Sequence, residues 1–177
     1  LIRLSERALA TKPEVLIWPE AAVPNMIRHD PETREAVRNL AASHRVWLIL
    51  GADDAVLRTG STDGKEADFY NSSFLINTEG EIVSTYRKQR LVLFGEYIPF
   101  VRWLPFLKHL APIGDGFKAG DRPVPFRLPE LHASTSVLIC FEDTFPHLAR
   151  DHVEADTDFL LNLTNDGWFG ESAAQWQ

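Results

Sequence analysis

The sequence of 177 residues is long enough for one domain with a hydrophobic core, and its 45% hydrophobic and 24% charged residues are ordinary for a globular protein. The 18 Lys and Arg against 25 Asp and Glu give a net charge of −7, which argues against a nucleic-acid-binding surface and against a polybasic membrane anchor. The single cysteine excludes an internal disulfide, and no apolar stretch is long enough to span a bilayer.

Two helices are predicted near the N-terminus. The first opens the chain, because apolar residues recur there at helical spacing. Its apolar positions are Leu1, Leu4, Ala8 and Leu9. The second begins at Asp30-Pro31-Glu32, with Asp as N-cap and Pro in the first helical position, and is expected to end near Ser43 or His44. The side chains expected to face the core are Ala36, Val37, Leu40 and Ala41.

Strands are predicted where short apolar runs end at turn residues. One at 15–18 ends at Pro19-Glu20, and one at Val46–Leu50 is ended by Gly51. The polar stretch Asp53–Ala67 is expected to be a surface loop. The remaining strands expected are Tyr70–Ile76 and Ile82–Tyr86, joined through Asn77–Gly80, then Val124–Leu128, Thr135–Cys140 and Phe159–Thr164. With a helix at Phe145–Val153, this alternation predicts stacked α/β layers.

The segment Tyr97–Ile113 is apolar and is interrupted by prolines, which makes one long helix improbable. It either covers the core or forms an apolar arm over an active site that touches lipid. Gly114, Gly116 and Gly120 follow it and are candidate hinges for such an arm.

Four other polar residues have structural interpretations. His147 and His152 are expected on the surface of their helix, because their spacing does not match a metal-binding helix pair. Asn71 and Asn162 begin glycosylation sequons, but both fall in predicted strands, so we interpret them as chance matches.

Glu20, Lys88 and Cys140 each stand at the end of a predicted apolar strand. Parallel-sheet enzymes present a nucleophile on the sharp turn after a core strand. Taken singly, each residue also has a plainer interpretation. Cys140 can be an inert packed thiol, Glu20 a solvated loop residue, and Lys88 a member of a surface cluster with Arg87 and Arg90, with Glu96 as its partner.

The three residue types together suit acyl transfer through a thioester. A thiolate is the reactive nucleophile, and a carboxylate can take the thiol proton. An ammonium lowers a thiol pKa and stabilises charge on the attacked carbonyl, with the backbone N–H of Phe141 as second donor. Glu142 is expected to cap a helix start, or to hold Lys88 or the Cys140 loop. This chemistry requires neither a metal nor an organic cofactor, and a Cys–His protease dyad has no positive support.

At these residues the chain resembles the nitrilase, or carbon–nitrogen hydrolase, superfamily, and within it the apolipoprotein N-acyltransferase branch. Four phrases carry the resemblance: Trp18–Pro24; Phe94–Pro99; Cys140–Asp143 followed by Phe145-Pro146; and Asn165–Ser172. The last is the most specific. The chain departs from the family pattern at Arg90 and Leu93, where His and Pro are frequent, and at Phe141, where Tyr is frequent.

The resemblance implies an α-β-β-α sandwich with a catalytic triad of Glu20, Lys88 and Cys140, supported by Glu96. It implies a phospholipid acyl donor and a diacylglyceryl-modified apolipoprotein acceptor. Asn165-Asp166-Gly167 is interpreted either as a turn or as part of the pocket rim, and Trp168 as a residue that packs or contacts substrate.

The resemblance also implies that residues 1–177 are an internal fragment of a catalytic domain, incomplete at both ends, from a parent protein with membrane helices. The expected location is the bacterial cytoplasmic membrane, with the domain on its periplasmic face and the arm at 97–113 able to touch lipid. One alternative is a soluble amidase or nitrilase with the same triad. The other is a degenerate binding module, against which the intact triad argues.

Overall fold

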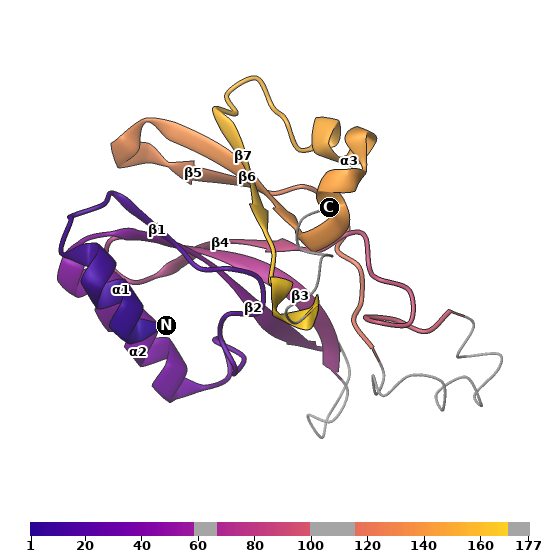
Figure 1. Cartoon of the computed structure of the whole chain (residues 1–177), viewed down its shortest axis with the longest axis horizontal. Coiled ribbons are helices and arrows are strands. Elements are labelled where there is room, and N and C mark those ends of the chain that lie inside the picture. Colours follow the sequence, from indigo (N-terminus) through magenta and orange to yellow (C-terminus); the bar gives the residue numbers. More distant parts are fainter. Residues whose placement is uncertain (59–66, 100–115, 170–177) are drawn as a thin grey trace.

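The computed structural model describes residues 1–58, 67–99 and 116–169, and shows two β-sheets with helices packed outside the larger one and a further short helix beside the smaller one (Figure 1). The four-stranded sheet has the order β1 (Val15–Ile17), β2 (Trp47–Leu57), β3 (Ala67–Ile76) and β4 (Ile82–Arg87). The three-stranded sheet has the order β5 (Pro125–Leu128), β6 (Ala133–Ile139) and β7 (Phe159–Leu163). The helices are α1 (Ile2–Leu9), α2 (Pro31–His44) and α3 (Pro146–Asp151). The predicted α/β class is confirmed.

The strand directions bring several strand ends to one edge. β1 pairs with β2 in parallel, while β3 is antiparallel to both β2 and β4, so β1, β2 and β4 run in the same direction. β6 and β7 are also parallel to each other. The carboxyl ends of parallel strands lie at the same edge of a sheet, and loops there are the usual position of functional side chains. Glu20 follows β1 and Lys88 follows β4, whereas Cys140 follows β6.

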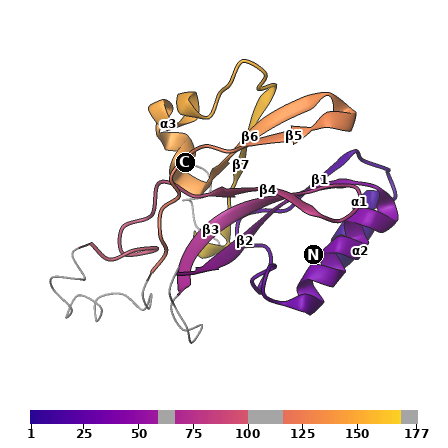
Figure 2. The same cartoon turned by 180° about the vertical axis from the view of Figure 1, so that it is seen from behind.

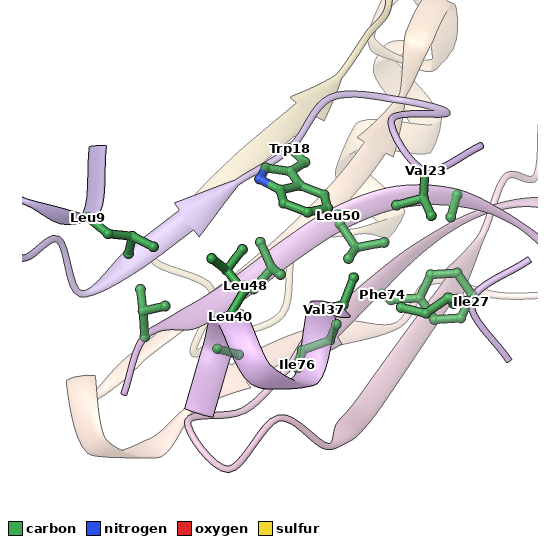
Figure 3. Packing of buried hydrophobic residues seen from close by; sticks show 13 residues of the cluster. Leu9, Trp18, Val23, Ile27, Val37, Leu40, Leu48, Leu50, Phe74 and Ile76 are labelled. Carbon is green, nitrogen blue, oxygen red and sulfur yellow. The ribbon is translucent and has the colours of Figure 1, made fainter. Parts of the chain in front are cut away.

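Side chains along each strand point alternately to the two faces of the sheet, so the larger sheet contributes to a separate hydrophobic core on each face. Leu48 and Leu50 of β2 pack with α1 and α2, together with Val37 and Leu40 of α2 (Figure 3). On the opposite face of β2, Trp47 packs against the second sheet. That inter-sheet cluster also contains Ile49, Leu75, Tyr86, Phe126, Leu128, Val137, Ile139 and Leu163. Helices α1 and α2 therefore cover the outer face of the larger sheet, the smaller sheet covers its inner face, and α3 lies beside the smaller sheet (Figure 2).

Helix α2 begins and ends as the sequence predicts. The Asp30 side chain accepts a hydrogen bond from the Glu32 backbone N–H, and the helix is followed by Arg45 in the left-handed conformation with φ 50°. Val37, Leu40 and Ala41 are buried as expected. Ala36 is exposed, so its predicted inward orientation is wrong.

Strand β2 does not end at Gly51, and the predicted loop from Asp53 is wrong for the residues described. β2 continues to Leu57 and pairs with β3 along its length, down to Leu57 opposite Ala67. Gly51 has a packing role instead. A Cβ atom at this position would lie 2.6 Å from Glu20 Cα and 2.6 Å from the Pro19 carbonyl oxygen. Glycine therefore lets β2 approach the chain at Glu20 closely.

The later elements match the predictions with small shifts, and one side chain differs. The hairpin between β3 and β4 turns through Gly80, whose φ of +81° suits glycine. His152 is buried rather than exposed, so its predicted surface position is wrong. Its ring packs edge-on against Tyr86 at 5.1 Å between centroids, and its Nδ1 lies 2.9 Å from the Leu148 carbonyl oxygen.

The predicted apolar arm at 97–113 falls mostly outside the described residues, as does Gly114. The chain returns through Gly116, which has φ +72°, and Gly120. A Cβ atom on Gly120 would lie 2.2 Å from the Arg87 carbonyl oxygen, so glycine there is explained by close packing. In the described ranges, no helix combines the length and the apolar character needed to cross a bilayer.

Candidate active site

Cys140 lies on a sharp turn directly after β6. Its φ is +57°, a left-handed conformation that a non-glycine residue rarely adopts, and it begins a short 3-10 helix, η3 (Cys140–Thr144). Val137 to Ile139 of β6 are buried, whereas the thiol is half-buried. Backbone strain of this kind is frequent in functional sites. A sharp turn directly after a strand directs the side chain away from the sheet. The sharp turn predicted after this strand is present.

Glu20, Lys88 and Glu96 form a buried charged cluster beside this thiol. Lys88 is 1% exposed, and its Nζ lies 2.9 Å from Glu96 Oε1 and 3.4 Å from Glu20 Oε1. Glu20 is 5% exposed. Cys140 is close enough for its thiolate to interact electrostatically with both Lys88 and Glu20. The structure thus brings together predicted residues from three separate segments of the chain, which follow β1, β4 and β6.

Asn71 links the two carboxylates, and the sequence analysis missed it. Its Nδ2 donates to Glu20 Oε1 and to Glu96 Oε1, each at 2.8 Å. It lies on β3 directly opposite Asp53 of β2. The available signal was the polar run Asn71–Ser73 inside an otherwise apolar strand. All three residues are buried, which is uncommon for such side chains unless a buried network requires them.

Glu96 also shapes its own loop. Its second oxygen, Oε2, accepts a hydrogen bond from the Val92 backbone N–H at 2.8 Å, while Oε1 faces Lys88 and Asn71. One carboxylate therefore fixes the loop 92–96 and the position of the lysine ammonium together.

Glu142 holds the loops that follow β4 and β6 rather than the Lys88 ammonium. It is fully buried, and it accepts hydrogen bonds from the Tyr86 hydroxyl at 2.9 and 3.0 Å. Three backbone N–H groups also donate to it. They belong to Gln89 at 2.7 Å, Arg90 at 2.9 Å and Ile139 at 2.8 Å. Of the roles predicted for Glu142, capping η3 and holding the Cys140 loop agree with these contacts.

The surroundings keep the thiol protonated and the lysine charged. Burial raises the pKa of Cys140, and the negative charge of Glu20 raises it further, against the opposing effect of Lys88. Burial acts to lower the pKa of Lys88, but its hydrogen bond and charge interaction with Glu96 and the charge of Glu20 hold that pKa above its ordinary value. A reaction through this thiol would therefore need a base, and Glu20 is a carboxylate whose charge acts on the thiol.

Two further groups interact with the sulfur. Hydrogen bonding from the Phe141 backbone N–H and from the Thr164 hydroxyl favours the thiolate. Thr164 directly follows β7, and the sequence analysis did not select it. The Phe141 N–H therefore lies beside the Cys140 sulfur.

The phrase after Thr164 forms a turn. Asn165 Oδ1 accepts a hydrogen bond from the Gly167 N–H at 3.1 Å, which supports the turn interpretation of Asn165. The backbone of Trp168 lies in the 3-10 helix η4 (Asp166–Phe169), and its side chain falls outside the description.

Asp53 is a further carboxylate at this site that the sequence analysis did not select. Burial raises its pKa, and the charges of Glu96 and Glu20 add to that effect. Asp53 lies near Glu20 and Glu96, so three carboxyl groups surround the single positive charge of Lys88, which cannot neutralise all of them.

The Glu20→Gln substitution is expected to make the Cys140 thiol ionise more readily and, at the same time, to slow the reaction that needs a base. Removing the Glu20 charge lowers the pKa of Cys140, because that charge raises it. The Glu20→Gln variant should therefore react severalfold faster with iodoacetamide at pH 8, while any turnover through Cys140 that needs Glu20 as base falls at least about hundredfold. Alkylation rates measured from pH 6 to 10 check this, with Glu14→Gln as the control. Slower alkylation together with slower transfer would contradict the assigned role.

The chain is similar to known proteins in sequence and in fold. The chain matches the carbon-nitrogen hydrolase family over residues 1–177. The apolipoprotein N-acyltransferase of Geobacter metallireducens is 36% identical over 177 residues, which cover 99% of this chain and 32% of that protein. That of Brucella suis is 33% identical over 182 residues, covering 100% of this chain and 33% of that protein. The chain thus spans about a third of the length of these curated relatives.

Among solved structures, an amidase from Nesterenkonia sp. AN1 superposes with a TM-score of 0.61. It is 17% identical, and the match covers 96% of this chain and 63% of that one. This similarity concerns the fold. From the family match along its whole length and this shared fold, we conclude that the chain belongs to the carbon-nitrogen hydrolase family.

Proposed function

We propose that the protein containing this chain transfers a fatty acyl group from a phospholipid to the N-terminal diacylglyceryl-cysteine of an apolipoprotein. The observation that carries the proposal is the Cys140 turn beside the buried Glu20–Lys88 pair. The relatives named apolipoprotein N-acyltransferase, at 33% and 36% identity over nearly all of this chain, support the choice of acceptor.

In the first half-reaction, Glu20 takes the Cys140 proton as sulfur attacks the ester carbonyl carbon at the sn-1 position. The Lys88 ammonium and the Phe141 N–H stabilise the oxyanion. The carbon–oxygen bond of the ester then breaks, Glu20 returns the proton to the departing alkoxide, and a lysophospholipid leaves. Cys140 is left as an acyl thioester.

In the second half-reaction, the neutral α-amino group of the acceptor attacks the thioester carbonyl. The same donors stabilise the oxyanion, the carbon–sulfur bond breaks, and an amide forms. Glu20 takes one proton from the attacking nitrogen and returns it to the Cys140 thiolate. The enzyme is regenerated without a cofactor, and the kinetics are ping-pong.

The lipid substrates define the expected setting. Such an enzyme works at the bacterial cytoplasmic membrane, with this catalytic domain on the periplasmic face, and residues 1–177 form part of that domain. The apolar segment 97–113 is positioned in the sequence next to Glu96, so lipid contact by this segment would bring the donor towards the site.

The alternative is hydrolysis of a small amide or nitrile by the same triad, with water as the acceptor. The solved Nesterenkonia amidase, which carries an acrylamide adduct at its active-site cysteine, supports this alternative through the shared fold. The two functions differ in the acceptor of the acyl group, since both pass through a thioester.

The test is an acyl-transfer assay of the complete gene product in detergent micelles with phosphatidylethanolamine and a diacylglyceryl-cysteine peptide. The proposal predicts an N-acylated peptide and an equal amount of lysophospholipid, both absent with Cys140→Ala. Hydrolysis of a small amide without any transfer to the peptide would support the amidase instead.

A further inference from the structure

A cavity of about 560 Å³ lies beside the candidate catalytic residues. Its wall consists of two short segments and three aromatic rings, namely Gln89–Leu91, Phe117–Ala119, Tyr97, Phe141 and Phe145. Parts of this wall directly follow Lys88, Glu96 and Cys140 in the chain. The cavity is therefore built on the same turns that present the catalytic side chains.

Backbone hydrogen bonds tie the far wall to those turns. The Phe117 N–H donates to the Glu96 carbonyl oxygen at 2.7 Å, and the Gly120 N–H donates to the Lys88 carbonyl oxygen at 2.8 Å. The segment 117–120 is thus held at a fixed distance from both catalytic loops. A group bound in the cavity would keep a defined position relative to the thiol.

The lining carries positive charge and no carboxylate. Its two charged side chains are Arg90 and Lys118. The Lys118 ammonium lies 2.8 Å from Asp68 Oδ2, which offsets its charge. The Arg90 guanidinium lies over the Phe145 ring, 6.0 Å from its centroid, and within the described part of the chain it has no carboxylate at ion-pair distance. Arg90 is the cation most available to a ligand.

A glycerophospholipid has the chemistry that this wall suits. Its phosphodiester is separated from the sn-1 ester by only a short glycerol backbone, so placing the ester at Cys140 brings the phosphate close by. A guanidinium binds phosphate through two parallel charge-assisted hydrogen bonds. The aromatic side chains of Phe141 and Phe145 would flank the glycerol and the first carbons of the acyl chains.

We propose that this cavity binds the phosphate of the phospholipid donor and that Arg90 is its principal contact. This inference rests on the proposed function, and it adds the residue that recognises the phosphate of the donor lipid.

The test compares two donors with the same acyl chains, phosphatidylethanolamine and diacylglycerol, of which only the first has a phosphate. Acylation of Cys140 in the complete gene product is followed by intact-mass spectrometry as donor concentration varies. The variants are Arg90→Gln, Arg90→Lys and the control Arg122→Gln, an exposed arginine outside the cavity lining. Inorganic phosphate is added in a separate series as a free-anion probe.

The proposal predicts that Arg90→Gln raises the phosphatidylethanolamine concentration for half-maximal acylation roughly tenfold or more. Its acylation by diacylglycerol should equal that of the unchanged protein, Arg90→Lys should recover part of the loss, and Arg122→Gln should have no effect. Because diacylglycerol reports on the integrity of the loop, a folding defect would be seen with both donors.

Three outcomes would overturn the inference while the proposed function stands. These are an unchanged response of Arg90→Gln to phosphatidylethanolamine, an equal loss with both donors, and inhibition by inorganic phosphate that is as strong with diacylglycerol as with phosphatidylethanolamine. Absence of acylation of the unchanged protein by either lipid would overturn the proposed function, and the inference with it.

Discussion

Replacing Lys88 with methionine is expected to lower the rate of Cys140 acylation by at least about hundredfold. Methionine keeps most of the side-chain length but removes the charge that faces Glu96 at 2.9 Å and Glu20 at 3.4 Å. Loss of one oxyanion donor alone reduces a rate by roughly 10² to 10³. Without the ammonium, the buried carboxylates of Glu20 and Glu96 also repel each other with no positive charge between them.

The same substitution should also destabilise the fold, because removing one partner of a buried ion pair costs about 3–5 kcal/mol. Single-turnover acylation and urea unfolding, measured on the same preparation, separate the two effects. Lys12→Met is the matched control, since Lys12 is exposed. An acylation rate near that of the unchanged protein, in a variant shown to be folded by circular dichroism, would contradict the role assigned to Lys88.

Replacing Glu142 with alanine is expected to have the largest effect on stability. The carboxylate is fully buried and accepts hydrogen bonds from the Tyr86 hydroxyl and from the N–H groups of Gln89, Arg90 and Ile139. Each buried donor left without a partner costs about 1–3 kcal/mol, so the sum is a large part of the ~5–15 kcal/mol that stabilises a typical domain.

Glu142→Gln keeps the shape and so tests the loop connection in a folded protein. An amide retains one acceptor oxygen but places an NH₂ group against at least one donor, so the loops after Lys88 and β6 should lose their mutual alignment. We expect thermal unfolding at a lower temperature and acylation reduced at least about tenfold, whereas the exposed Glu130→Gln should match the unchanged protein. Normal acylation by Glu142→Gln would show that this alignment is unimportant.

The parts of the site that the sequence predicts are those determined by local patterns. Short apolar runs that end in a polar residue predicted the positions of Glu20, Lys88 and Cys140, and the shared direction of β1 and β4 explains why Glu20 and Lys88 lie at one edge of the larger sheet. Asp30 as an N-cap likewise predicted the start of α2. Each of these signals depends on a few adjacent residues, which is why one sequence is sufficient to detect it.

The parts that were missed depend on contacts between distant segments. The polar residues of β2 suggested a loop, yet Asp54 is buried and its carboxylate lies 3.3 Å from Arg28 and 3.1 Å from Arg87. Asn71 similarly becomes a site residue only through carboxylates that lie 51 and 25 positions away in the chain. Buried polar groups are satisfied by such partners, and no local pattern records them.

His152 illustrates the same limit in the core. A histidine near the end of a short helix is usually solvated, but here Tyr86 and the helix itself enclose the ring. The hydroxyl of Tyr86 donates a hydrogen bond to Glu142. His152 therefore packs against the tyrosine that contacts Glu142, the residue that holds the loops after β4 and β6.

The central claim is that Cys140 carries the acyl group as a thioester. The most direct measurement is intact-mass spectrometry of the complete gene product after incubation with phosphatidylethanolamine in the absence of an acceptor. The account predicts a mass gain of one fatty acyl group that maps to Cys140, is removed by neutral hydroxylamine and is absent from Cys140→Ala. An adduct of the same mass that persists in Cys140→Ala, or no adduct while transfer to the acceptor peptide continues, would contradict it.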